Sequence, residues 1–299
     1  MKILITGGLG FVGTCLTGRF LEEGHSVTSL DRAPHARLAH PGYAYLSADT
    51  TLPGPWQEVV ATHDAVVNLA GATIFKRWND AYKKAVWDSR ILTTRNLVQA
   101  IPEGSGITLL STSAAGYYGF RGDEECSEDT LPGDDFLARV CVGWETEAKK
   151  AADRGARVVI TRFGVVFGKN GGALSQMAKT FRMGVGGPLG SGNQWFSWIH
   201  IEDLASAMLF CLNNKAVSGP LNFMAPYPVR NRDMAKALGR VLKRPAMIPA
   251  PAWAVKLALG EFGDAILHGQ RGVPTGLSKL GFTFKYPEIE GAMREVLFS

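Results

Sequence analysis

The chain has 299 residues, 46% of them hydrophobic and 20% charged, which is typical of a folded globular protein and excludes a disordered or fibrous one. The net charge of +5 is dispersed, and its densest basic group, residues 76–90, is interrupted by Asp80 and Asp88, which favours a solvated helix face over a nucleic-acid site. No apolar run is long enough to span a membrane, and the first residues lead directly into a predicted strand, not a signal peptide. We therefore expect no nucleic-acid or membrane partner.

The cysteines and histidines show no metal-binding pattern. The four cysteines are scattered without a C-x-x-C pair, and the six histidines lack ligand spacing. This usage predicts a reducing, cytoplasmic location and no metal site. The sequence leaves open whether the protein forms a homodimer.

The first half of the chain alternates β-branched runs with helical segments. Strands are predicted at residues 2–6, 25–30, 43–47, 65–70, 107–112 and 157–162. Helices are predicted at residues 11–24, 79–101 and 136–148. Strands this apolar, separated by helices, predict a parallel sheet covered on both faces. The fold class is therefore α/β, with a Rossmann-like doubly wound sheet.

The character of the sequence changes near residue 170. Glycine-rich loops follow, then a strand and helix within residues 198–212 and another strand at 219–225. We predict a dinucleotide-binding domain over residues 1–170, to which residues 196–225 return. Residues 171–195 and 226–299 are predicted to form a smaller, mostly helical lobe on the substrate side.

The clearest local signal is ITGGLGFVG, with Gly7, Gly10 and Gly13 directly after the first strand. Glycine permits the tight turn and a close approach to a pyrophosphate, and the helix that begins with Phe11 and Val12 offers free N–H groups to that anion. A structural glycine turn is the alternative. The position between strand and helix favours dinucleotide binding.

Two adjacent residues favour different cofactors. Asp31, 18 residues after Gly13, could accept hydrogen bonds from the ribose 2′-OH of NAD, whereas Arg32 could hold the 2′-phosphate of NADP. The sequence leaves NAD and NADP open. Asp49, after the third predicted strand, is assigned to the same cofactor region.

The segment NLAG ends the fourth predicted strand. Leu69, Ala70 and the small Gly71 fall at the carboxyl edge of the sheet, where ligands bind in such folds. They either let the cofactor pass or form a simple strand-end turn.

Together these motifs resemble the extended short-chain dehydrogenases/reductases of the NAD-dependent epimerase/dehydratase type. More closely, the chain resembles an atypical subgroup labelled epimerase family protein or cell-division inhibitor, whose C-terminal domain has unknown function. The segments that carry this resemblance are SRILTTRNLV, STSAAGYYG, VCVGWE, GVGGPLGSGNQWFSWIHIEDLA and LGEFGDAILHGQRGVPTGLSKLGFTFKYPEIE. Nothing in these residues resembles a polymer-binding element that would support the cell-division label.

The resemblance implies a catalytic serine, tyrosine and lysine, of which only the serine is present. Ser113 matches the serine, but Cys141 stands at the tyrosine position and Glu145 at the lysine position. Arg90 stands where an active-site asparagine is usual, and we assign it to the cofactor region. One hypothesis pairs Glu145 with Arg90.

The replaced pair weakens the case for reductase chemistry. A glutamate beside a cysteine raises the pKa of the thiol, so Cys141 is interpreted mainly as a small buried hydrophobe. Tyr117 and Tyr118 are weaker candidates for a proton donor, and residues 184–198 form a candidate substrate loop. Two functions stay open. One is an NAD(P)-dependent oxidoreductase or epimerase acting on an unidentified small molecule, and the other is a non-catalytic NAD(P)(H)-binding regulatory or redox-sensing protein.

Overall fold

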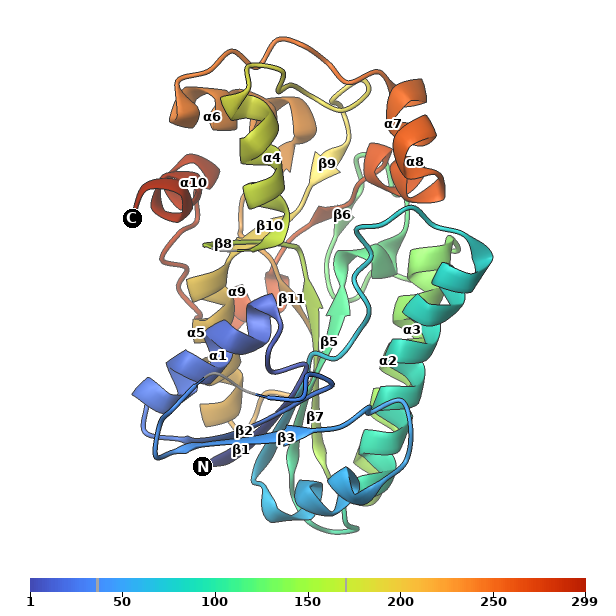
Figure 1. Cartoon of the computed structure of the whole chain (residues 1–299), viewed down its shortest axis with the longest axis vertical. Coiled ribbons are helices and arrows are strands. Elements are labelled where there is room, and N and C mark those ends of the chain that lie inside the picture. Colours follow the sequence, from blue (N-terminus) through green and yellow to red (C-terminus); the bar gives the residue numbers. More distant parts are fainter. Residues whose placement is uncertain (36–37, 170) are drawn as a thin grey trace.

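The computed structural model describes residues 1–35, 38–169 and 171–299, and its centre is a seven-stranded sheet (Figure 1). The strands of this sheet are β1 (Lys2–Thr6), β2 (Ser26–Asp31), β3 (Tyr43–Ser47), β4 (Ala65–Asn68), β5 (Thr108–Ala114), β7 (Arg157–Phe163) and β11 (Gly219–Phe223). Their order is β11-β7-β5-β4-β1-β2-β3, and every neighbouring pair is parallel. The predicted doubly wound α/β fold is confirmed.

Helices cover both faces of this sheet, as Figure 1 shows. One face carries α1 (Phe11–Glu22) and α5 (Ile201–Asn213), and the other carries α2 (Asp80–Ala100), α3 (Phe136–Lys149) and the 3₁₀ helix η1 (Pro55–Thr62). Because strand side chains alternate between faces, Ile3 and Ile5 enter the core under α1, while Leu4 enters the core under α2.

The remaining elements follow the sheet or form the C-terminal lobe. They are η2 (Ala115–Tyr118), β6 (Glu125–Cys126), η3 (Ala152–Arg154), β8 (Val165–Gly168), α4 (Gly172–Arg182), β9 (Trp195–Phe196), β10 (Trp198–His200), β12 (Val229–Arg230), α6 (Asn231–Leu242), α7 (Ala252–Leu259), α8 (Glu261–Leu267), β13 (Arg271–Gly272), α9 (Thr275–Lys279) and α10 (Ile289–Phe298). A separate core that includes Phe167, Trp198 and Leu238 joins α4, α6 and α10. The domain boundary near residue 170 stays a prediction.

His200 joins α10 to α5. Its Nδ1 accepts the backbone N–H of Glu202 and so caps α5, and its Nε2 lies 2.8 Å from Glu295. Burial lowers the pKa of His200 despite the neighbouring Glu295 carboxylate. The side chain therefore acts as a structural link between α5 and α10.

Across the described ranges, none of the helices is both long and apolar enough to cross a membrane. The same ranges contain no cluster of three histidine, cysteine, aspartate or glutamate side chains that could hold a metal ion.

Candidate functional site

The glycine turn lies where β1 ends, at the point where the strand order of the sheet reverses between β1 and β4. Gly7 has a φ of +70°, and a Cβ on it would lie 3.1 Å from the backbone N of Ala70. A Cβ on Gly13 would lie 2.4 Å from the carbonyl oxygen of Gly7. The turn therefore requires glycine at both positions, and it brings residues 7–13 against the NLAG segment.

This turn is suited to a pyrophosphate. The first turn of α1 carries no acidic residue, and no side chain caps the N-terminus of the helix. The backbone amides of Phe11, Val12 and Gly13 thus begin a 12-residue helix at the carboxyl edge of the sheet. The positive end of the helix dipole and the lack of a Cβ at Gly10 fit a bound dinucleotide.

Asp31, Arg32 and Asp49 gather where β2 and β3 end. One carboxylate oxygen of Asp31 accepts the backbone N–H of Leu9 at 3.1 Å and the other accepts that of Arg32 at 2.7 Å. Asp31 therefore braces the glycine turn, while the Arg32 side chain is exposed. Hydrogen bonds from Thr51 lower the pKa of Asp49, and the positive charge of Arg32 adds to that shift.

Arg90 supports the loop after β4. Its guanidinium donates to the carbonyl oxygens of Ala72 and Val86, at 3.0 and 3.1 Å, and lies over the Trp144 ring. A Cβ on Gly71 would lie 3.0 Å from the guanidinium carbon of Arg90. Arg90 therefore fixes the position of Gly71 and Ala72, at the edge where the cofactor residues lie.

A buried network connects Ser113, Glu145 and Arg162. Ser113 Oγ donates to Glu145 Oε1 at 2.8 Å. Arg162 donates to the two oxygens of the same carboxylate, at 2.8 Å from Nε and 3.0 Å from Nη2. The side chains of Arg162 and Glu145 are 2% and 1% exposed, so this two-point ion pair lies in the interior.

The strand register explains why these residues meet. Ser113 on β5 and Arg162 on β7 are paired residues in adjacent parallel strands, so their side chains emerge on the same face of the sheet. Glu145, on α3, packs over that face. The hypothesis that Glu145 pairs with Arg90 is wrong, because Arg162 occupies both oxygens of the carboxylate and Arg90 stacks on Trp144 instead.

Arg162 is the residue that the sequence analysis missed. Its Nη1 donates to the Tyr118 hydroxyl at 3.0 Å, and Tyr118 donates in turn to Asn222 Oδ1 at 2.6 Å. Asn222 donates to the carbonyl of Val273 at 2.8 Å, so the network reaches the C-terminal region. The sequence signal that could have found it is the charged Arg162 within the apolar strand RVVITRF. A charged side chain in the interior of a protein requires a counter-ion.

Cys141 has the environment of a core residue. It is 4% exposed, and its thiol lies 3.9 Å from the carbonyl oxygen of Ala114. Burial, and secondarily the charge of Glu145, raises the pKa of Cys141 to about 11. The structural interpretation of Cys141 is thereby supported, and Cys141 is not an activated nucleophile.

We expect thiol-labelling reagents to leave Cys141 largely unmodified in the native protein at pH 8. A thiol with a pKa of about 11 is only ~0.1% thiolate at that pH, and the thiolate is the reactive form. Iodoacetamide labelling followed by peptide mass analysis checks this, with urea-unfolded protein as the reactive control. Rapid native labelling at Cys141 would show that the helix opens readily.

Tyr117 is more accessible than the network itself. Its ring lies against the Arg162 guanidinium, whose carbon is 3.6 Å from the ring centre, and the residue is half-buried. Burial raises the pKa of Tyr117 even though Arg162 opposes the shift. The phenol therefore keeps its proton at neutral pH. Tyr118 is fully buried, and burial raises its pKa to about 12.

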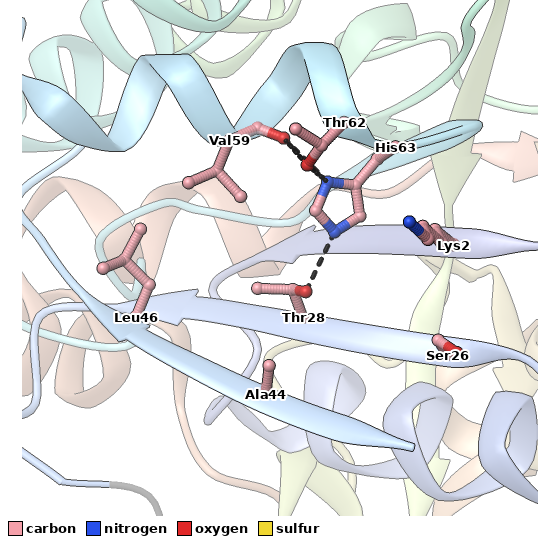
Figure 2. A pocket seen from close by; sticks show the side chains of 8 residues that line it. All are labelled: Lys2, Ser26, Thr28, Ala44, Leu46, Val59, Thr62 and His63. Atoms are coloured by element: carbon pink, nitrogen blue, oxygen red, sulfur yellow. Dashed lines mark hydrogen bonds between the residues drawn. The ribbon is translucent and has the colours of Figure 1, made fainter.

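A shallow pocket lies elsewhere, at the amino end of the sheet (Figure 2). It is lined by residues such as Lys2, Thr28 and Leu46, and His63 closes one side. The His63 ring is held by the carbonyl of Val59 at 2.8 Å and by the Thr28 hydroxyl at 2.9 Å. Both ring nitrogens are engaged and the cofactor residues lie at the opposite edge, so this pocket is not part of the candidate site.

Comparisons with known proteins agree with this geometry. The model of the NAD-dependent epimerase/dehydratase family matches residues 3–223, and that of a domain of unknown function, DUF1731, matches residues 250–296. An Arabidopsis thaliana protein named epimerase family protein SDR39U1 homolog, chloroplastic, is 39% identical, with 99% of this chain and 87% of that protein covered. An epimerase family protein of Mycobacterium bovis is 38% identical over 97% of this chain and 96% of its own length.

Solved structures give the same result. The human epimerase family protein SDR39U1, crystallised with NADPH, superposes with a TM-score of 0.85 at 35% identity, covering 99% of both chains. A UDP-glucuronic acid 4-epimerase from Bacillus cereus, with a TM-score of 0.80 over 99% of this chain and 97% of its own, shares the fold at 17% identity. The glycine turn at the sheet's switch point and the family match over residues 3–223 together show that this chain belongs to the NAD-dependent epimerase/dehydratase family.

Proposed function

We propose that this protein binds NADP(H) and acts through that binding, as a regulatory or redox-sensing protein without serine–tyrosine–lysine chemistry. The observation that carries the proposal is the burial of all three residues at the positions of the catalytic triad. Ser113, Cys141 and Glu145 are 1%, 4% and 2% exposed. The Ser113 hydroxyl donates its hydrogen bond to Glu145 and therefore cannot donate the same hydrogen bond to a substrate carbonyl.

The cofactor site itself is intact. The glycine turn and the N-terminus of α1 would hold the pyrophosphate, and residues 69–71 would line its path toward Ser113. When bound, the nicotinamide ring can give or accept a hydride. The chain's own part is to bind and orient the dinucleotide. Cys141 stands at the position of the acid/base tyrosine, and the Glu145–Arg162 pair fills the lysine position beside it.

We propose NADP as the preferred form of the cofactor. Arg32 is exposed beside the glycine turn, and both Asp31 oxygens already accept backbone N–H groups. The human relative, at 35% identity, was crystallised with NADPH. A guanidinium at this position suits a 2′-phosphate better than a free ribose hydroxyl.

Replacement of Arg32 by alanine should therefore weaken NADPH binding selectively. Loss of a charge-assisted contact of about 1.5–3 kcal/mol corresponds to roughly 10–100-fold in affinity for NADPH. NADH affinity should change less than about threefold, because NADH lacks the phosphate. Fluorescence titration with each dinucleotide measures the ratio, and an equal loss for both would contradict the assignment of Arg32 to the 2′-phosphate.

The second candidate function is an oxidoreductase that uses Tyr117. The supporting observation is that Tyr117 is half-buried, retains its proton and lies beside the Arg162 guanidinium. In this case Tyr117 would deliver a proton to a substrate oxygen, while Ser113 would only support the strand.

A turnover screen separates the two functions. Wild-type protein with NADPH is incubated with panels of carbonyl compounds and nucleotide sugars, and cofactor oxidation and product are both measured. The proposal expects tight NADPH binding and no product above the blank. Reproducible turnover that Tyr117→Phe abolishes would establish the second function, and turnover that Ser113→Ala abolishes would show that the buried network opens for catalysis.

A further inference from the structure

The tip of the C-terminal lobe exposes two short segments with the same pattern. Residues 179–185 contain Lys179 and Arg182 followed by Met183 and Val185, and residues 243–248 contain Lys243 and Arg244 followed by Met247 and Ile248. The apolar side chains are highly exposed, at 69% and 57% in the first segment and 83% and 57% in the second. We call these two segments the lobe tip.

The chain that directly follows the first segment lies against the end of the second. The backbone of Gly187 approaches Ile248 so closely that a Cβ on the glycine would lie 2.0 Å from the Ile248 carbonyl oxygen. The Ala250 N–H donates to the carbonyl of Pro188 at 2.9 Å. Figure 1 shows the connection from α6 to α7 running along the top of the molecule, above the end of α4. The exposed side chains therefore belong to one surface.

This surface carries uncompensated positive charge. Neither residues 171–195 nor residues 234–260 contain an aspartate or glutamate. Arg240 is paired with Glu290 at 2.7 Å, and Lys256 is paired with Asp264. Within the described parts of the chain, no carboxylate lies within ion-pair distance of Lys179, Arg182, Lys243 or Arg244.

A pocket of about 420 Å³ opens beside the second segment. Cationic side chains dominate its lining: Lys236, Arg240, Lys243 and Arg244. Met247 stands at the same pocket, and Trp253, 70% exposed at the start of α7, follows six residues later. Cations and a protruding aliphatic side chain are thus combined at this pocket, and an exposed tryptophan follows on α7.

We propose that the lobe tip is a docking surface for the anionic face of a lipid bilayer. Peripheral proteins bind such membranes by inserting a few apolar side chains at the level of the headgroups, while neighbouring lysines and arginines attract anionic lipid. The apolar side chains here protrude from two chain segments instead of lining a groove for a peptide. Because the sequence has no membrane-spanning segment, we expected no membrane partner. A peripheral docking surface needs no such segment, so this proposal differs from that expectation.

Vesicle flotation tests the proposal with the full-length protein. Vesicles of phosphatidylcholine alone are compared with vesicles that also contain phosphatidylserine. The protein should float with the anionic vesicles, with a partition coefficient at least about tenfold above that for neutral ones, and salt should weaken the binding. The double variants Met247→Asp/Ile248→Asp and Lys243→Glu/Arg244→Glu should each reduce the partition at least about fivefold.

Matched variants control for charge and folding. Leu52→Asp and Lys215→Glu each make a single substitution of the same type at an exposed position outside the lobe tip and should bind vesicles like the wild type. All variants should retain NADPH affinity and thermal stability. These two measurements show whether a variant has lost vesicle binding alone or has unfolded. This result is independent of the proposed cofactor function.

Three outcomes would overturn the proposal. The first is equal flotation with neutral and anionic vesicles. The second is anionic binding that the Met247→Asp/Ile248→Asp variant leaves intact, which would indicate a general polyanion site. The third is displacement by inorganic phosphate but not by chloride at equal ionic strength, which would indicate a site for the free anion.

Discussion

Replacing Arg162 with methionine should lower the free energy of unfolding by about 3–5 kcal/mol, because the buried Glu145 carboxylate then loses its two-point partner. Among the described residues it keeps only Lys149, a largely exposed cation 3.6 Å away. Burial acts to lower the pKa of Arg162, but the hydrogen bonds and charge of Glu145 outweigh it and the net shift is upward. The ion pair therefore favours the charged form despite its burial. Urea denaturation of wild type and variant measures the difference.

A second variant shows whether the loss of stability comes from the Glu145 charge that remains buried without Arg162. Arg162→Met combined with Glu145→Gln removes both charges, so the double variant should be more stable than Arg162→Met alone. Arg95→Met is the matched control, because Arg95 also pairs with a glutamate of α3, at 2.8 Å from Glu147, but is 46% exposed. Glu147 keeps Lys150 at 2.9 Å in this variant, and a pair with one solvent-exposed partner contributes under about 1 kcal/mol, so the loss should be smaller. Equal losses for Arg162→Met and Arg95→Met would contradict a buried role for the Glu145–Arg162 pair.

The sheet and the cofactor edge were predictable because their signals are local. Short, continuously apolar strands separated by helices allow few arrangements other than a parallel doubly wound sheet. The positions of β3 and the helix at Phe136 agree closely with the predicted ones. Gly7 and Gly13 follow directly from strand-to-turn spacing, since Gly13 is constrained by Gly7 and Gly8 within the same turn and Gly7 has a positive φ there.

The partner of Glu145 was not predictable in the same way. The choice between Arg90 and Arg162 depends on which side chains share a face of the sheet, and a one-residue change of register would reverse that face. Ser113 pairs with Arg162 across β5 and β7, a relation between residues 49 positions apart. The matching of positions with catalytic relatives assigned Cys141 and Glu145 to the triad positions, which stays a prediction, and it carried no information about a residue outside the triad.

The network also changes what Ser113 can do. In a serine–tyrosine–lysine site the serine hydroxyl is free to donate to a substrate oxygen, but here that proton points to Glu145 at 2.8 Å. The same carboxylate is held by Arg162, which is linked through Tyr118 and Asn222 to the C-terminal region. The lysine position is thus occupied by a fixed structural link, and the tyrosine position by the buried Cys141.

Replacing Gly13 with alanine should abolish most of the cofactor binding. The added Cβ would lie 2.4 Å from the Gly7 carbonyl oxygen and 2.8 Å from the Gly8 Cα, and these are backbone atoms that cannot rotate away. The turn and the start of α1 must then separate, which displaces the amides that hold the pyrophosphate. We expect NADPH affinity to fall by roughly 100-fold or more, equivalent to about 2.7 kcal/mol.

Gly18 on the same helix provides the control. A Cβ at Gly18 would meet no atom within 4 Å, so Gly18→Ala adds a methyl group without a clash. Because alanine is the better helix former, this variant should be more stable by about 0.5–1 kcal/mol and should bind NADPH like the wild type. Isothermal titration and thermal denaturation of both variants separate the two effects. If Gly13→Ala retained wild-type affinity, the close approach of α1 to the glycine turn would not be what holds the dinucleotide, and the cofactor site would have to lie elsewhere on the carboxyl edge.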